Sequence, residues 1–174
     1  MARIYSAKFA IIKKLVGLGR NSTSKLTIPP MLDVPGMKLR IMQSEVKVGL
    51  FKQFMASGYK ITGHNAGSLK AFLKASPDEC NMKFLNLDDG KAFAKWLTDQ
   101  TGIKFRIPTN TEWLHAVQAL GHHLSGNHME WTEGIATNKT SHILRYLYNL
   151  GRSEAHPPET RNEDFALRLV ADID

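Results

Sequence analysis

Cysteine is almost absent from this 174-residue chain, and so are long apolar runs. Because Cys80 is the only cysteine, no disulfide can form within the chain, and nothing in the sequence requires an oxidising compartment. The longest apolar runs, residues 9–12 and 15–18, are far shorter than a membrane span and are separated by two lysines. These lysines also interrupt what could have been the apolar region of a secretory signal peptide. We therefore expect no transmembrane helix, no secretory signal peptide, and a protein that stays inside its cell or particle.

Acidic residues are missing from the first 32 positions. Residues 1–45 hold eight Lys/Arg and two Asp/Glu, so most of the formal net charge of +7 lies there and the remainder is nearly neutral. Between Lys8 and Arg20, apolar residues are interspersed with lysines, which fits a basic amphipathic helix, a targeting peptide or an arm on an anionic surface. A first strand or helix packed on the domain also fits and is the more common case. A nucleic-acid partner is not indicated, because basic and aromatic residues do not alternate as in a recognisable binding module.

Length and composition favour one domain. A chain of 174 residues with 43% hydrophobic content is enough for one compact domain and barely enough for two. From residue 21 to 36 the composition shifts to Ser, Thr and Pro, which is typical of a linker or a loop-rich entry to a fold. We therefore assign residues 1–36 to a basic N-terminal extension and linker, and residues 37–174 to the folded domain.

The domain sequence combines short strand patterns with amphipathic helix patterns. Asn86 is a natural N-cap for one helix, and Thr109 with Glu112 forms a capping-box pattern before the next. The three tryptophans are expected in the core rather than in a ligand cage. We expect strands over 37–42 and 104–107, helices over 47–56, 87–101 and 111–120, a short helix near 68–74, and loops with short strands after residue 121.

Five sequence blocks carry a resemblance to a known family. They are EVKVGLFKQF over 45–54, NLDDGKAFAKWL over 86–97, IPTNTEW over 107–113, GNHMEWT over 126–132 and ALRLV over 166–170. Together they resemble the formylglycine-generating enzyme or sulfatase-modifying-factor family, a variant of the C-type lectin fold. The resemblance covers about residues 40–172. It implies an α+β fold with short strands, two to three helices and much irregular loop.

The family's catalytic cysteines are not matched in this chain. The family's oxygen-dependent oxidation of a substrate cysteine resembles copper–thiolate chemistry and requires two cysteines near the C-terminal end of the domain. No cysteine lies there, and Cys80 alone cannot supply two thiolate ligands. The family's RGGSW core appears here as RYLYN over 145–149. The resemblance therefore implies a pseudoenzyme, and formylglycine synthesis is not expected.

Histidines offer a second route to a metal site. Other members of the wider family hold iron with three histidines that belong to a separate helical domain, and no such domain fits in this chain. The local histidines lie close in sequence to two glutamates, but a transition metal would need their lone pairs to converge. We expect solvated or hydrogen-bonding histidines, and a degenerate metal-dependent oxidase is the competing hypothesis. The residues concerned are His115, His122, His123 and His128, with Glu112 and Glu130.

Calcium is the better metal candidate. The family often holds this ion in its GNVWEW loop through backbone carbonyls and the glutamate carboxylate. Carried onto this sequence, the ligands are Glu130 and carbonyls near Gly126 and His128, a set of oxygen donors that suits calcium. Met129 replaces the first tryptophan of the family's block, and Glu130 could equally hydrogen-bond loop amides. Both interpretations remain open at this point.

The segment over residues 138–162 departs from the family, in a fold that displays variable loops on a fixed scaffold. It combines aromatic, amide and cationic side chains, the composition of a binding surface. A shortened loop that merely closes the domain is the alternative. The candidate ligand-binding residues are Tyr146, Tyr148, Asn149, Arg152, His156 and Arg161.

The sequence therefore predicts a non-catalytic module that binds a protein or glycan ligand through its C-terminal loop face. The resemblance extends to ligand-display proteins of phages and of diversity-generating retroelements, which makes a recognition role on a virion a reasonable specialisation. The expected location is accordingly cytoplasmic or virion-associated. A structural subunit that docks into a larger assembly through residues 1–36 is the alternative.

Overall fold

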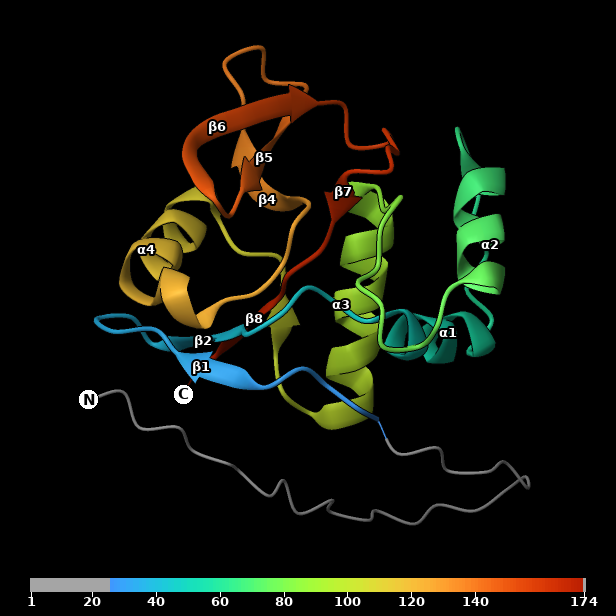
Figure 1. Ribbon diagram of the computed structural model, residues 1–174, viewed down its shortest axis with the longest axis horizontal. Helices are drawn as coiled ribbons and strands as arrows, with labels where there is room; N and C mark the ends of the chain where they lie inside the picture. The colour runs from blue at the N-terminus through green and yellow to red at the C-terminus, as the bar shows by residue number, and fades with distance from the viewer. Residues whose placement is uncertain (1–25, 174) are drawn as a thin grey trace.

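Two four-stranded sheets organise the fold, which we describe for residues 26–173 from a computed structural model (Figure 1). The first sheet has the order β1-β2-β8-β3, with all neighbours antiparallel. It brings the beginning and the end of the domain together. Its strands are Met31–Asp33 (β1), Leu39–Met42 (β2), Val170–Asp172 (β8) and Phe105–Arg106 (β3).

The second sheet has the order β6-β5-β4-β7 and is formed by the C-terminal third of the chain. Strands β4, β5 and β6 form an antiparallel meander, and β7 pairs with β4 in parallel. The predicted α+β architecture is confirmed, and so are short strands after residue 121. The strands are Met129–Ile135 (β4), His142–Tyr146 (β5), Asn149–His156 (β6) and Phe165–Ala166 (β7).

Four α-helices surround these sheets in the described part of the chain (Figure 1). They are Val48–Ala56 (α1), Ala66–Ala75 (α2), Leu87–Thr101 (α3) and Asn110–Leu120 (α4), and a 3₁₀ turn, Gly121–His123, follows α4. Both predicted N-terminal caps are confirmed. Asn86 accepts a hydrogen bond from the Asp89 amide at 2.8 Å, and Thr109 accepts one from the Glu112 amide at 3.2 Å. In each case the acidic side chain bonds back to the cap residue's amide, which completes a capping box.

The core divides into two clusters of buried side chains. In the larger one, α1 and α3 meet through stacked and edge-on aromatic rings, with Phe51, Phe54 and Phe93 at its centre. The smaller one lies under α4 and contains Trp113 and Val170. The three tryptophans pack in or against these clusters as predicted, because their blocks form the scaffold of the fold.

The first sheet begins before residue 36. Residues 31–33 form β1 and pair with β2, and Val34 is buried. Of the two interpretations of residues 21–36, these residues fit a loop-rich entry to the fold better than a free linker, since their backbone is hydrogen-bonded into the first sheet; the domain boundary at residue 36 stays a prediction. The basic extension over residues 1–25 lies outside the described residues. Among residues 26–173, no helix is long and apolar enough to cross a membrane.

Arg106 links the first sheet to the start of α4. Its hydrogen bonds to two carboxylates make the free energy of unfolding depend on pH. Its guanidinium donates to Glu112 at 2.7 Å and to Asp172 at 2.8 Å. These hydrogen bonds lower the pKa of Glu112 and the pKa of Asp172 from their ordinary values of 4.5 and 3.8. A carboxyl group whose pKa is lower in the folded state than in the unfolded state stabilises the folded protein fully at pH values above its unfolded-state pKa. This stabilisation is lost as the pH falls through the folded-state pKa.

We therefore expect the free energy of unfolding to fall as the pH drops below about 4.5. Arg106→Met should reduce the slope of this acid limb, because the two carboxyl groups then titrate nearer their ordinary values. Urea denaturation between pH 2 and 7 measures the effect. Lys95→Met removes an exposed ion pair with Asp99 and is the matched control. An acid limb with equal slopes in Arg106→Met and wild type would contradict this assignment.

Candidate functional site

The segment over residues 138–162, predicted as a loop face, is largely a β-hairpin. β5 and β6 pair in an antiparallel register, and the turn between them contains Leu147 and Tyr148. Tyr148 is 67% exposed at the tip, although its neighbour Leu147 is buried. The hairpin therefore presents its side chains on a hydrogen-bonded scaffold rather than on an irregular loop.

Five of the six predicted ligand-binding residues lie together on this hairpin. The rings of Tyr146 and Tyr148 meet edge-on with centroids 6.3 Å apart, and the guanidinium of Arg152 lies 5.6 Å from the Tyr146 centroid. Glu154 accepts from Arg152 at 3.0 Å and pairs with His156 Nε2 at 3.1 Å. The hydrogen bonds from His156 and Arg152 lower the pKa of Glu154. The fifth residue, Asn149, is exposed beside the turn.

Arg161 does not share this surface. Its side chain is 2% exposed, and its guanidinium forms an ion pair with Asp89 of α3 at 2.7 Å. Tyr59 also donates to Asp89, at 2.8 Å. Burial, followed by the charge of Asp89, raises the pKa of Tyr59, so this hydroxyl stays protonated. Arg161 thus joins the segment before β7 to α3 and lies apart from the other five candidate residues, and its role in ligand binding stays a prediction.

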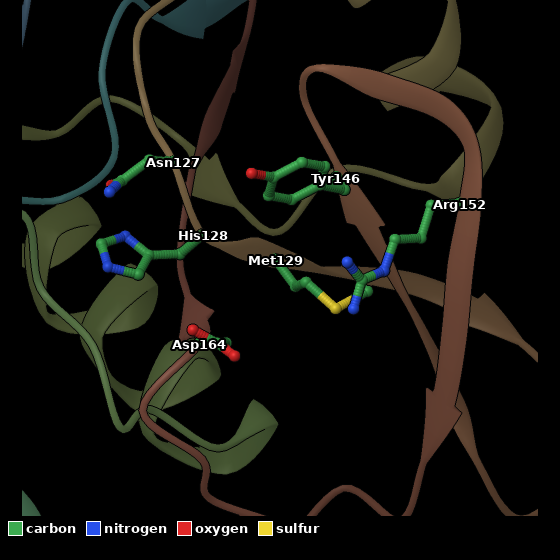
Figure 2. Close-up of a pocket in the computed structure, with 6 residues that line it drawn as sticks. All are labelled: Asn127, His128, Met129, Tyr146, Arg152 and Asp164. Carbon is green, nitrogen blue, oxygen red and sulfur yellow. The ribbon is translucent and has the colours of Figure 1, made fainter.

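A small pocket of about 110 Å³ opens beside the hairpin (Figure 2). Tyr146 and Arg152 contribute to it from β5 and β6, Asp164 contributes from the segment before β7, and Asn127 and His128 come from the loop before β4. Met129, at the start of β4, completes the lining. The pocket combines a cation, a carboxylate and an amide, which suits one small polar group of a larger ligand.

His128 is held at this pocket by a buried carboxylate. Its ring Nδ1 lies 2.8 Å from Oε2 of Glu45, and its backbone amide donates to Oε1 of the same residue at 2.9 Å. Glu45 is fully buried, whereas the His128 side chain is 14% exposed. The two contacts fix both the ring and the backbone of His128, so the loop before β4 presents a rigid wall to the pocket.

Glu130, the residue after Met129 of the pocket lining, forms a fully buried ion pair with Arg168 at a distance of 2.7 Å. The guanidinium also donates to the carbonyls of Met42, Gln43 and Ser125. Burial opposes the charged guanidinium, but the carboxylates of Glu130 and Glu45 outweigh it and raise the pKa of Arg168. The pair thereby connects β2, the loop before β4 and the segment between β7 and β8.

The carboxylate proposed as a calcium ligand, that of Glu130, is engaged in other interactions in this arrangement. Both oxygens of Glu130 accept from Arg168, and one of them also accepts from Trp113 Nε1 at 2.7 Å. A guanidinium thus provides the positive charge that the Glu130 carboxylate faces in this arrangement. His128 turns its ring toward Glu45. Calcium binding to the loop of Gly126, His128 and Glu130 stays an untested prediction.

The histidines do not converge on a common point. His115 contacts the Pro35 carbonyl at 2.7 Å, while the rings of His122 and His123 lie against one another with centroids 3.9 Å apart. His128 pairs with Glu45 instead. Within residues 26–173, no group of three or more His, Cys, Asp or Glu side chains is placed to hold a metal ion.

The fold and these blocks agree with one protein family. The Sulfatase-modifying factor enzyme 1-like domain matches residues 16–162. The chain belongs to this family. The match reaches residue 16, which is ten positions before the described part of the chain begins. No curated protein matches the chain.

Solved structures show the same fold at low sequence identity. PvdO from Pseudomonas aeruginosa is 13% identical with a TM-score of 0.61, and the match covers 78% of this chain and 80% of the PvdO chain. CarF is 15% identical with a TM-score of 0.60, and the match covers 78% of this chain and 87% of the CarF chain. Treponema denticola variable protein 1 is 15% identical with a TM-score of 0.57, and the match covers 77% of this chain and 84% of that protein's chain. The predicted sulfatase-modifying-factor variant of the C-type lectin fold is thereby confirmed.

Several residues of the site were missed by the sequence reasoning. Asn127 and Asp164 are exposed polar residues in loops and carry no signal of their own. Glu45 and Arg168 could have been found, because each is a charged residue inside a family block that is otherwise mostly apolar. A charge in such a place requires a buried partner of opposite sign.

Proposed function

We propose that this member of the sulfatase-modifying-factor family is a non-catalytic binding module. It binds a protein or glycan ligand through the face formed by the β5–β6 hairpin and the adjoining pocket. The observation that supports this most directly is the cluster of Tyr146, Tyr148 and Arg152 beside the pocket, with Tyr148 67% exposed. Aromatic rings and arginine provide much of the binding energy in protein interfaces, and the rings lose little conformational freedom on binding.

The composition argues against the family's oxidative chemistry in this chain. Copper bound by two thiolates needs two cysteines, and the full sequence has one. Cys80 is half-buried and lies in the segment between α2 and α3, outside the hairpin and the pocket lining. The donor set for that metal is therefore incomplete, and we derive no reaction step from it.

A recognition role on a virion or toward a host is the specialisation that we favour. It is supported by the likeness in fold to Treponema denticola variable protein 1, a protein described as variable. The hairpin surface meets a requirement of such a role, since its exposed side chains can change without disturbing the buried Arg168–Glu130 pair. Exposed positions on a rigid scaffold tolerate substitution far better than core positions.

A cysteine-peptide oxidation assay, combined with elemental analysis, tests the non-catalytic assignment. The full chain is purified without chelator and without a histidine tag, loaded with copper, and incubated in air with a cysteine-containing sulfatase peptide. Mass spectrometry then detects conversion of cysteine to formylglycine. The proposal predicts no conversion and no stoichiometric iron or copper in the protein as purified. Conversion, or either metal bound at one equivalent, would refute it.

A further inference from the structure

Strand β6 leaves one of its edges unpaired within the described chain. In the sheet order β6-β5-β4-β7 it is an outer strand and pairs only with β5 (Figure 1). It runs from Asn149 to His156, and Arg152, Ser153 and Ala155 are exposed. An edge strand of this length offers a row of free backbone donors and acceptors to another strand.

The charges of β6 make this edge complementary to itself. Arg152 and Glu154 are its only Lys, Arg, Asp or Glu residues, and their side chains are 54% and 37% exposed. They lie on the same face of the strand, because Arg152 Nη2 is 3.0 Å from Glu154 Oε1. An edge with charges of one sign would repel a second copy, whereas opposite signs two residues apart attract one in an antiparallel arrangement.

We propose that two copies of this chain form a symmetric dimer through antiparallel pairing of β6 with β6, with Ser153 on the two-fold axis. In this register each Arg152 lies directly opposite Glu154 of the partner subunit, and the contact occurs twice. A register centred on Arg152 or on Glu154 would place like charges opposite one another, which selects the Ser153 register. The register shift between β5 and β6 leaves residues 150–152 without regular partners on β5, so the contact joins these residues to the regularly paired residues 153–156.

The same register covers an exposed apolar side chain. Leu150 is 37% exposed and comes to lie opposite His156 of the partner subunit. The dimer joins the two second sheets into one continuous sheet of eight strands and places the two hairpin faces next to each other. Two sites held together raise the effective concentration for a ligand that repeats on a surface. The dimer itself does not depend on the proposed ligand-binding role.

Charge reversal on β6 provides a test with an internal rescue. Sedimentation velocity of the full chain over a range of concentrations is expected to show a monomer–dimer equilibrium. Arg152→Glu and Glu154→Arg should each weaken dimerisation by about tenfold, because two attractive pairs become repulsive. An equimolar mixture of the two variants should restore dimers, since each Glu then faces an Arg again. Lys95→Glu and Asp99→Arg make the same charge changes on α3 and should leave the equilibrium unchanged.

Three results would overturn the proposal. The first is a wild-type protein that remains monomeric up to the highest concentration measured. The second is a dimer that Arg152→Glu and Glu154→Arg leave as stable as in wild type, because the interface would then lie elsewhere. The third is a mixture of the two variants that does not regain dimers although each variant is folded by circular dichroism. Restored heterodimers support the β6 register directly.

Discussion

Arg168→Met is expected to lower the free energy of unfolding by about 3–5 kcal/mol, the range found when one partner of a buried ion pair is removed. The change leaves two fully buried carboxylates, Glu130 and Glu45, without the guanidinium between them. It also removes the donors for the carbonyls of Met42, Gln43 and Ser125. Since the total stability of a domain is on the order of 5–15 kcal/mol, the loss should be visible as a large fall in the urea midpoint.

Arg40→Met provides the matched control for this prediction. Arg40 forms an ion pair with Asp33 at 2.7 Å, but both side chains are well exposed, at 42% and 59%. An exposed pair contributes about 0–1 kcal/mol, so the control variant should unfold near the wild-type midpoint. A loss below 1 kcal/mol in Arg168→Met would show that the carboxylates can be neutralised or solvated without the guanidinium, and would contradict the role given to this pair.

Gly126→Ala is expected to destabilise the protein by about 1–3 kcal/mol, the usual effect of overfilling a packed interior. A β-carbon at this position would lie 2.8 Å from Cδ of Glu45 and 2.9 Å from Nη2 of Arg168. Neither side chain has room to move, because Glu45 is held by His128 and Arg168 by Glu130. The backbone of the loop before β4 must shift instead, which also displaces the His128 wall of the pocket.

Gly67→Ala is the matched control for Gly126→Ala, because it makes the same substitution at a position with free space around it. Gly67 lies in α2, it is exposed, and a β-carbon there meets nothing within 4 Å. Alanine in an exposed helical position is favoured over glycine by about 0.5–1 kcal/mol, so this variant should be stabilised. If Gly126→Ala were as stable as wild type in the same denaturation experiment, the loop before β4 would have room for a β-carbon. This result would contradict the tight packing of Gly126 against Glu45.

Sequence reasoning predicted those parts of the fold that local chemistry determines. The caps at Asn86 and Thr109 are set by residues three positions apart, and both helices begin where the sequence placed them, within one residue. β1 was missed because three residues among prolines carry little strand signal, and pairing with β2 is what defines them. The β5–β6 hairpin was missed for a related reason: its turn contains Leu147 and Tyr148 in place of the Asn-Gly or Asp-Gly that indicates a hairpin.

The pairing of residues inside the site could not be predicted, although Glu45 and Arg168 stand out as charged residues, because the contacts join distant parts of the sequence. Glu45 and His128 are 83 positions apart, and Arg168 and Met42 are 126 positions apart. Neither pair has a local pattern that would indicate the contact. The same limitation applies to the burial of Arg161, whose partner Asp89 lies 72 positions away. The surface positions of the hairpin were accessible to sequence reasoning because their composition alone distinguishes them.

Binding to a glycan array and to a panel of purified surface proteins tests the central claim most directly. Tyr148→Ala removes the exposed ring at the hairpin tip, and Ile173→Ala removes a 36% exposed apolar side chain next to the first sheet as the control. The account predicts that a glycan or protein bound by wild type is bound equally by Ile173→Ala and at least about 30-fold more weakly by Tyr148→Ala, the loss typical of an interface hot spot. Binding that Tyr148→Ala leaves unchanged would contradict the assignment of the β5–β6 hairpin as the recognition face.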